Sequence, residues 1–569
     1  MKKKISFLIT LIFAVIICYP ATKSLMKKNF FHTHDYTHVA RLSEMHTAIF
    51  DGHFPVRWSK NFGFGYGMPL FNFYGPLPYY IAEIIHLLGF SFVGSIKAII
   101  YLNFIASFMA MFYLAKYYWG KWGGYISATA AIYVPYRAVN TYVRGSINEL
   151  AGITFTIISL YAINLLMRKN KIKWVIFSAF SLSAIILSHN ITALISFPII
   201  FLFAVFHMHQ TSQSIRAKKM FRIIYSFILS IGLSAFYAIP ALVEKSHTAI
   251  NKITSGYFHY SQHFLYLRQF IKSEWGYGGS IFGLEDDISF EIGRIQIVLA
   301  LIGASTIFHQ RKRKKKYTSS TIIISSLIIV ASMFMATFKT KFIWDNFQLL
   351  QYVQFPWRFL SIITIFISLL AGGVVVKRRR FSFTKLPITI GLIISIILLN
   401  KSFFQPEKFL DNDNALYYSD EKRIQKEMSG ILPDYIPETV DYKTTTPPEY
   451  RFSLMENGQE KEIKPIINRT HEFLVETPIK ENSTFVINIF NFPGWKFYIN
   501  DKEYIPRIGE NLPVFYLDLD SQVIQTDKAY ISGIFTETPI RQISNIISIT
   551  TLLIISYLYL NERFAKSRG

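Results

Sequence analysis

Residues 5–21 read ISFLITLIFAVIICYPA, an apolar run preceded by the basic residues Lys2, Lys3 and Lys4. As an α-helix this run covers roughly 26 Å, close to the thickness of a bilayer's hydrocarbon core. Similar runs recur along the chain, and the sequence therefore predicts a polytopic α-helical membrane protein with about 12 (12–13) transmembrane helices. The predicted spans are 5–21, 98–117, 122–139, 150–167, 173–189, 191–207, 221–240, 293–308, 319–337, 358–376, 385–403 and 541–560.

The chain of 569 residues carries a net charge of +24. In a soluble protein this excess would suggest nucleic acid as a partner. Here the basic residues gather in short loops, at 168–171, 216–219, 311–316 and 377–380. With Lys2–Lys4 inside, twelve alternating spans place all of these clusters on the cytoplasmic side, which is the positive-inside pattern. We therefore expect a multi-pass protein of the cell membrane with cytoplasmic N- and C-termini and no nucleic-acid partner.

The same topology divides the chain into domains. Residues 1–404 form a transmembrane domain with outer loops at 22–97 and 241–292. Residues 405–540 are polar, with short alternating segments such as Trp495–Ile499, followed by the turn residues Asn500 and Asp501. We expect a small extracytoplasmic β-sandwich there, and then a final transmembrane helix and cytoplasmic tail at 541–569.

One apolar segment does not fit the alternation. Leu77–Phe92 is short and contains Glu83 and His86. Counting it as a span would move the basic cluster at 168–171 to the outside. We therefore expect a helix that lies in the outer membrane interface.

The polar loop after the first span holds Asp35 among His32, His34 and His38. Such a carboxylate could act as a general base at the membrane surface. It could also bind a cation together with the histidines. A third interpretation is structural, because Asp35 precedes a helical pattern at 37–50 and could cap that helix. The apolar positions of this pattern are Val39, Leu42, Met45, Ala48 and Ile49.

Two more ionisable side chains are expected at the outer ends of spans. Glu149 begins a span just after Arg144, and could either face a functional cavity or anchor the helix at the interface. His189 and Asn190 lie in the turn of a helical hairpin. Turn formation alone explains Asn190, whereas His189 is either a hydrogen-bonded structural histidine or part of a site.

Two arginines lie beside aromatic residues near the expected surface, Arg57 in Phe54–Trp58 and Arg358 in Phe355–Arg358. A guanidinium can bind a lipid phosphate with two parallel hydrogen bonds. The aromatic belt of a membrane protein also produces such pairs without a ligand. The sequence contains no P-loop, Rossmann fingerprint or zinc-protease motif.

Several blocks of this sequence resemble one bacterial family. In the first outer region they are HDYTHVARL (34–42), GHFPVRW (52–58) and GFGYGMPLFNFYGPLPYY (63–80). Further matches lie at 142–145 with Glu149, at 187–190, at 354–358 and at 492–495. The family is labelled 6-pyruvoyl-tetrahydropterin synthase-related membrane protein, although no feature here indicates pterin chemistry. It is similar to YfhO-type proteins and to the GT-C superfamily of membrane glycosyltransferases.

The resemblance implies a GT-C-like fold and a glycosyltransferase. Such an enzyme moves a sugar from a polyprenyl-phosphate donor in the membrane to an extracytoplasmic acceptor, which is a cell-surface polymer, a glycolipid or a protein. The expected catalytic residues are Asp35, Glu149 and His189. The expected substrate-binding residues are His34, Arg41, Arg57, Tyr74, Arg144, Asn190, Trp357 and Arg358. Asp35 is followed by Tyr36 and not by a second acid, so no metal ligand is assigned, and a divalent cation near Asp35 stays an open question.

Two other functions use the same sequence features. A transporter or flippase for a lipid-linked envelope precursor would also need basic and aromatic outer sites, but favours internal repeats and charges at the centres of spans. A non-enzymatic membrane scaffold would explain residues 405–540 and would give no role to Asp35 or Glu149.

Overall fold

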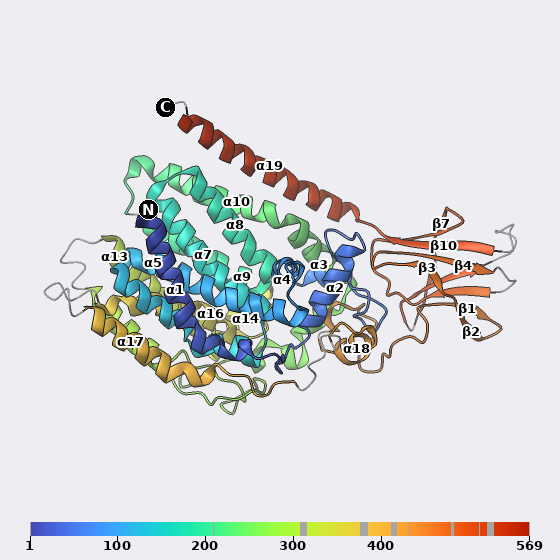
Figure 1. Ribbon diagram of the computed structural model, residues 1–569, viewed down its shortest axis with the longest axis horizontal. Coiled ribbons are helices and arrows are strands. Elements are labelled where there is room, and N and C mark those ends of the chain that lie inside the picture. Colours follow the sequence, from blue (N-terminus) through green and yellow to red (C-terminus); the bar gives the residue numbers. More distant parts are fainter. Residues whose placement is uncertain are drawn as a thin grey trace.

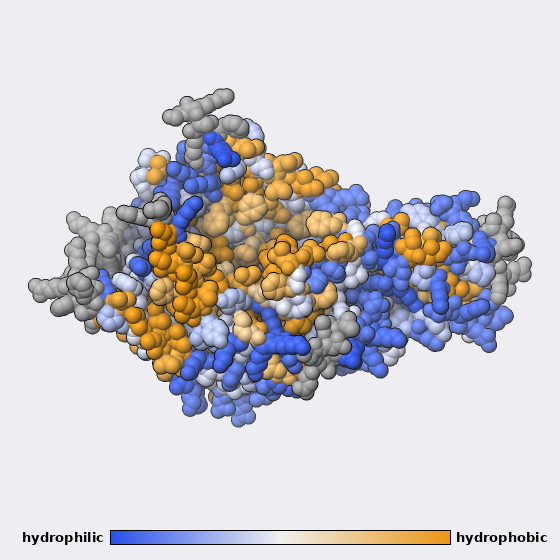
Figure 2. All heavy atoms as spheres, in the orientation of Figure 1, coloured by the Kyte–Doolittle hydropathy of each residue, from blue (hydrophilic) through white to orange (hydrophobic). Residues whose placement is uncertain are grey.

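The computed structural model describes residues 2–208, 210–307, 316–375, 385–410, 418–431, 433–478, 483–510, 512–519 and 528–567. These residues form a helical body and a β domain that projects from one end of it, while both termini lie toward the opposite end (Figure 1). Hydrophobic residues gather over the helical body, and hydrophilic residues cover much of the β domain (Figure 2). Arg311–Lys315 and Lys377–Arg380 of the predicted basic loops lie outside the described residues.

The described residues contain nine helices that are long and apolar enough to cross a membrane, and two shorter apolar helices, α8 (Ile172–Ser188) and α11 (Arg294–Ser305). The predicted polytopic helical membrane protein is confirmed. The nine spans involve α1 (Lys2–Thr22), α5 (Phe92–Ile132), α7 (Ile147–Lys169), α9 (Asn190–Met208), α10 (Gln213–Val243), α13 (Lys316–Met335), α16 (Leu360–Ala371), α17 (Lys385–Asn400) and α19 (Pro539–Ser567).

Helix α5 holds two of the predicted spans, because the chain reverses at Gly120. This glycine has φ 79° and ψ −177°, which no α-helix contains. The rings of Phe108 and Tyr125 lie 6.4 Å apart on the two sides of the turn. In one continuous helix these residues would be separated by roughly 25 Å. With α5 as a hairpin, the described residues contain twelve apolar helical segments.

Helix α4 (Leu77–Leu87) covers the segment that we expected at the interface. Its 11 residues extend roughly 16 Å, which is too short for a bilayer. Ile84 and Leu87 are exposed, whereas Glu83 is buried and contacts His46 Nδ1 at 2.8 Å. A helix with one apolar exposed face and one paired acid on its inner face suits a location between lipid and protein.

The β domain consists of two antiparallel five-stranded sheets, with strand orders β2-β1-β5-β9-β8 and β3-β4-β10-β6-β7. Rings from the two sheets meet in tilted contacts, with Phe452 4.6 Å from Phe473 and Phe497 4.5 Å from Phe515. The predicted sandwich before the last helix is confirmed. The strands are β1 (Phe452–Glu456), β2 (Gln459–Glu462), β3 (Pro465–Asn468), β4 (Glu472–Pro478), β5 (Ser483–Ile487), β6 (Trp495–Ile499), β7 (Lys502–Tyr504), β8 (Arg507–Ile508), β9 (Phe515–Leu519) and β10 (Lys528–Phe535).

The predicted tight turn joins β6 to β7. Asn500 and Asp501 both have positive φ, 48° and 65°, and Ile499 pairs with Lys502. Two left-handed residues between paired strands match the twist of an antiparallel hairpin.

The described residues between α17 and β1 form short helical turns and no named strand. One is the 3-10 turn Pro433–Tyr435, which lies against the helical body: the amide of Ala249 donates to the carbonyl of Ile436 at 2.9 Å. The strands therefore occupy 452–535, and part of the region that we assigned to the β domain covers the transmembrane domain instead.

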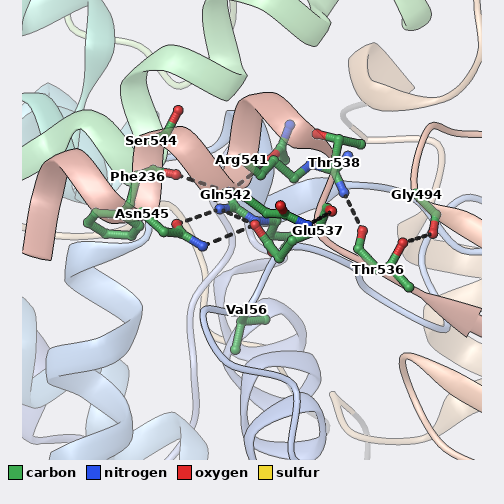
Figure 3. A network of polar contacts seen from close by, with 12 residues as sticks. Val56, Phe236, Gly494, Thr536, Glu537, Thr538, Arg541, Gln542, Ser544 and Asn545 are labelled. Atoms are coloured by element: carbon green, nitrogen blue, oxygen red, sulfur yellow. Dashed lines mark hydrogen bonds and ion pairs between the residues drawn. The ribbon is translucent and has the colours of Figure 1, made fainter.

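Ion pairs connect α19 and the segment before it to the helical body, and Figure 3 shows polar contacts around Glu537 and Arg541. Arg541 is completely buried, and its Nε donates to Glu244 Oε2 at 3.0 Å. Arg57 donates from Nε and Nη2 to the two oxygens of Glu537, at 2.6 and 3.0 Å. Glu244 also accepts hydrogen bonds from Asn72 and Thr538, each at 2.8 Å. Segments from the start, the middle and the end of the chain therefore share one polar network.

We expect Arg541→Ala to destabilise the folded protein strongly, because it leaves the buried Glu244 carboxylate without its cation. Breaking a buried pair in this way costs about 3–5 kcal/mol. The matched control is Arg469→Ala, which removes a half-exposed arginine paired with Glu472 on the β domain and should cost at most about 1 kcal/mol. Thermal unfolding of both variants in the same detergent is the measurement, and equal shifts would contradict the prediction.

Candidate functional site

The loop after α1 packs directly on the loop between α5 and α7. The amide of His34 donates to the carbonyl of Val143 at 2.9 Å, and the amide of Asp35 donates to that of Arg144 at 3.1 Å. The contact needs Gly145, which has φ 67° and where a Cβ atom would come within 2.3 Å of Thr33 Oγ1. This docking places the loop that carries Asp35 beside the loop that leads to Glu149, the two acidic residues that the sequence analysis singled out.

Asp35 is held by three side chains that all donate to its carboxylate. Arg41 Nη1 lies 2.8 Å from Oδ2, Thr37 Oγ1 lies 2.8 Å from Oδ1, and the Tyr74 hydroxyl lies 3.2 Å from Oδ2. The Arg41 guanidinium also lies over the Tyr74 ring, 4.5 Å from its centroid. The helix α2 (His38–Phe50) has no side-chain cap. The structural interpretation of Asp35 as a helix cap is therefore wrong, because its oxygens bind side chains instead.

These contacts decide the charge of Asp35. Burial opposes its ionisation, but the guanidinium of Arg41, with His38 and the hydrogen bonds, outweighs burial and holds the pKa of this carboxyl well below its usual range. Asp35 therefore stays ionised near neutral pH. Burial lowers the pKa of His38 to about 4, so this histidine is neutral. Its Nε2 donates to the carbonyl of Gly145 at 2.5 Å, and Nδ1 accepts from the Tyr79 hydroxyl at 2.6 Å.

Glu149 lies in the first turn of α7 and binds two arginines. Arg144 Nη1 donates to Oε2 at 2.8 Å, and Arg358 Nε lies 3.7 Å from the same oxygen. The Tyr136 hydroxyl donates to Oε1 at 2.5 Å. Only 2% of the Glu149 side chain is exposed, against 10% for each arginine. Two guanidiniums on one carboxylate leave a net positive charge, and we name Arg144, Glu149 and Arg358 the arginine cluster.

The aromatic Trp357 supports the arginine cluster. The Arg144 guanidinium lies over its ring at 4.6 Å, and its indole N–H donates to Ser280 Oγ at 3.2 Å. Arg358 donates through Nη1 to the carbonyl of Val353 at 2.7 Å, whereas its buried Nε has no hydrogen-bond partner among the described residues. An unsatisfied donor in a buried, positively charged cluster suits an anion.

Tyr74 lies between the two acidic regions. Its hydroxyl donates to Asp35, and it is a neighbour of both Arg144 and Arg358. His189 is an electrostatic neighbour of Glu149. Its Nδ1 accepts from the amide of Thr192 at 3.2 Å, so the ring proton is on Nε2.

The other predicted residues fall into two groups. Asn190 contacts the carbonyl of Phe73 at 3.5 Å, next to Tyr74, and the exposed His34 donates to the carbonyl of Tyr277 at 2.9 Å, beside Asp35. Arg57 is different, since all five of its N–H groups have acceptors in the junction network. No donor is left for a substrate phosphate, so the structure assigns Arg57 to the joining of the domains and not to substrate binding.

Over the described ranges, no three His, Cys, Asp or Glu side chains are arranged to hold a metal ion. Arg41 lies on the Asp35 oxygen that a cation would contact. This arrangement does not fit the open cation site considered for Asp35.

The sequence analysis missed Asp434. This residue belongs to the 3-10 turn Pro433–Tyr435 and acts electrostatically on Asp35 and Arg41. Burial raises the pKa of Asp434 to about 6, although Arg41 opposes the shift. An aromatic residue between two prolines, Pro433 and Pro437, inside a polar stretch was the available signal, and it was masked by the assignment of 405–540 to strands.

A double-mutant cycle tests the Asp35–Arg41 pair. Asp35→Asn leaves an arginine that is only 2% exposed without a counter-charge, and we expect a loss of about 3–5 kcal/mol in unfolding free energy. The double variant Asp35→Asn/Arg41→Met should lose clearly less than the sum of the single variants. The Asp35 pKa is depressed, so this stabilisation is present above about pH 4 and lost as the pH falls. Additive losses in chemical unfolding at pH 7 would contradict the pairing.

Comparison with solved structures gives only loose similarities. They include the apo oligosaccharyltransferase of Archaeoglobus fulgidus (12% identity, 71% of this chain and 56% of that chain, TM-score 0.45) and the mycobacterial arabinofuranosyltransferase AftD (13%, 70% and 27%, TM-score 0.44). A third is the A. fulgidus oligosaccharyltransferase AglB in complex with an inhibitory peptide and a dolichol-phosphate (11%, 72% and 57%, TM-score 0.44). Similarities of this degree carry no argument about activity.

Sequence comparison is more specific. A protein of Lactococcus lactis subsp. cremoris (strain MG1363), described as uncharacterized, is 25% identical over 265 residues, which are 45% of this chain and 42% of that protein. The chain thus matches less than half of that relative's length. The profile of a family described as "6-pyruvoyl-tetrahydropterin synthase related domain; membrane protein" matches residues 71–405. Because this match covers more than half of the 569 residues, the resemblance is confirmed and the chain belongs to that family of membrane proteins.

Proposed function

We propose that this protein is a membrane glycosyltransferase that moves a sugar from a polyprenyl-phosphate donor to an acceptor hydroxyl on the outer side of the membrane. The observation that carries the proposal is the position of the arginine cluster beside the Asp35 carboxylate, with Tyr74 between them. The two centres supply what sugar transfer needs: positive charge at a leaving phosphate and a carboxylate at the attacking group.

The arginine cluster is suited to the donor phosphate. It combines a net positive charge with low exposure, and low exposure strengthens electrostatic interactions. Guanidiniums also match the geometry of phosphate oxygens. Glu149 keeps the two like charges of Arg144 and Arg358 together when no donor is bound. The cluster begins the membrane helices α7 and α16, so a phosphate there lies at the depth of a lipid headgroup.

Asp35 is suited to the acceptor. Its oxygens are ionised and fixed in place, so they can accept a hydrogen bond from an incoming hydroxyl and orient it toward the donor. His34 and Asn190, which are both exposed, lie where the remaining groups of an acceptor would be contacted. The acceptor class is a cell-envelope polymer, glycolipid or protein.

The proposed orientation has a direct test. On a Cys18→Ala background, a cysteine introduced as Lys502→Cys, at the exposed first residue of β7, should react with a membrane-impermeant maleimide in intact cells. Cys18 is the one cysteine of the sequence, so its removal leaves the introduced cysteine as the only thiol that can react. A position that reacts only after the cells are opened would place the β domain in the cytoplasm and would reject the outer acceptor.

Activity is tested with purified protein, radiolabelled polyprenyl-phosphate sugars and a mixture of envelope acceptors, by following loss of the labelled donor. We expect Arg358→Ala to lower kcat/KM for the donor roughly ten- to a hundredfold, since a charged hydrogen bond contributes about 1.5–3 kcal/mol. Arg358→Lys should restore only part of the lost kcat/KM, because Lys lacks the planar guanidinium that can form two parallel hydrogen bonds to a phosphate.

The control is Arg294→Ala, which removes an arginine that is 67% exposed at the start of another helix and should leave the rate unchanged. Unchanged thermal unfolding of Arg358→Lys would exclude a folding defect as the cause. If the wild type consumes no lipid-linked sugar but moves one across vesicle membranes, the protein is a transporter and not a transferase.

A further inference from the structure

We propose that Asp434 is the general base of the transfer reaction, and that the Asp35–Arg41 pair positions the acceptor. This inference rests on the proposed function and deepens it. It assigns proton removal to a residue that reaches the site from the segment leading into the β domain.

Aromatic stacking and a backbone hydrogen bond fix the turn that carries Asp434. The ring of Tyr435 stacks on Phe73 with a centroid distance of 5.6 Å and an interplanar angle of 15°, and lies 6.4 Å from the ring of Tyr74. The carbonyl of Ile436 accepts from the amide of Ala249 at 2.9 Å. Tyr74 is the residue whose hydroxyl donates to Asp35. The residue next to Asp434 in this turn, Tyr435, therefore packs beside the same aromatic side chain that contacts Asp35.

The two aspartates differ in what they contact. Asp35 accepts hydrogen bonds from Thr37, Arg41 and Tyr74. Asp434 has no hydrogen bond or ion pair to any part of the chain that the structure describes. An unpartnered carboxylate keeps its lone pairs free to receive a proton, whereas a carboxylate pinned by a guanidinium resists protonation.

The charged and titratable groups that face Asp434 also favour Asp434, and not Asp35, as the residue that accepts the proton. Arg41 on α2 and Asp35 in the first loop act on its charge, and burial, the largest effect, raises its pKa to about 6. From the neighbouring 3-10 segment Ala249–Thr254, Lys252 points to the carbonyl of Glu438 and not to Asp434. A base works best when its pKa lies near the working pH. The depressed pKa of Asp35 makes that residue the poorer base.

The reaction step balances as follows. The acceptor oxygen forms a bond to the anomeric carbon of the sugar, and its proton moves to the Asp434 carboxylate. The bond between the anomeric carbon and the phosphate oxygen breaks, and its electron pair stays on the polyprenyl phosphate, beside Arg144 and Arg358. Asp434 then releases the proton to water.

The test compares Asp434→Asn, Asp434→Glu and the control Glu438→Gln, an exposed acid four residues further along. The assay is sugar transfer by the full-length protein in detergent with the donor that the wild type consumes. We expect Asp434→Asn to lower kcat about a hundredfold or more, with the donor KM within about threefold of wild type. Asp434→Glu should recover part of the rate, and Glu438→Gln should match the wild type.

The pH profile separates a base from a structural residue. The wild-type rate should fall on the acid side of about pH 6, and the residual rate of Asp434→Asn should lack that limb. Its thermal unfolding temperature at pH 7 should equal or exceed that of the wild type, because the substitution removes a desolvated charge.

Three results would overturn the inference. They are an Asp434→Asn enzyme with kcat within about twofold of the wild type, an acid limb that persists in this variant, or a fall in unfolding temperature that accounts for the lost rate. In each case the active wild type leaves the proposed function standing. A wild type that consumes no lipid-linked sugar removes the function and the inference together.

Discussion

Neutralisation of buried guanidinium groups is the constraint on which this structure depends. An arginine removed from water without a counter-charge costs several kcal/mol, and a carboxylate at close range offsets that cost. Four ion pairs do this here: Arg41 with Asp35, Arg144 with Glu149, Arg57 with Glu537, and Arg541 with Glu244. The first two pairs build the candidate site, and the last two fasten the final helix and the β domain to the helical body. The same interaction therefore shapes both the site and its support.

Charge is divided unequally between the two halves of the site. The arginine cluster is positive overall, whereas the side that holds Asp35, Arg41 and Asp434 combines two acids with one cation. Tyr74 touches Asp35 and lies within the field of the arginines. A substrate with a phosphate at one end of its reacting bond and a hydroxyl approaching the other end would meet complementary charge on both sides.

The sequence was informative where the signal is local. Apolar runs and helix length follow from neighbouring residues, so the membrane spans and the Asn500–Asp501 turn were predictable, as was a separate short helix at α4. Asp35, Glu149 and His189 were found because they flank spans. The role of Arg57 in joining the domains was not predictable, since its partner Glu537 is 480 residues away in the sequence. Asp434 was missed because its polar surroundings resemble those of the strands that follow, and only tertiary packing brings its turn against Phe73 and Tyr74.

The pairing of Arg57 with Glu537 has a consequence for the order of synthesis. A ribosome that adds about 5–20 residues per second needs roughly 24–96 s to travel from one partner to the other. During that interval the nascent first loop carries an arginine whose final acceptors, on Glu537 and Asn545, do not yet exist. The loop must wait in a hydrated or chaperoned form until the last helix enters the membrane. The junction between the final helix and the helical body is thus completed only near the end of translation.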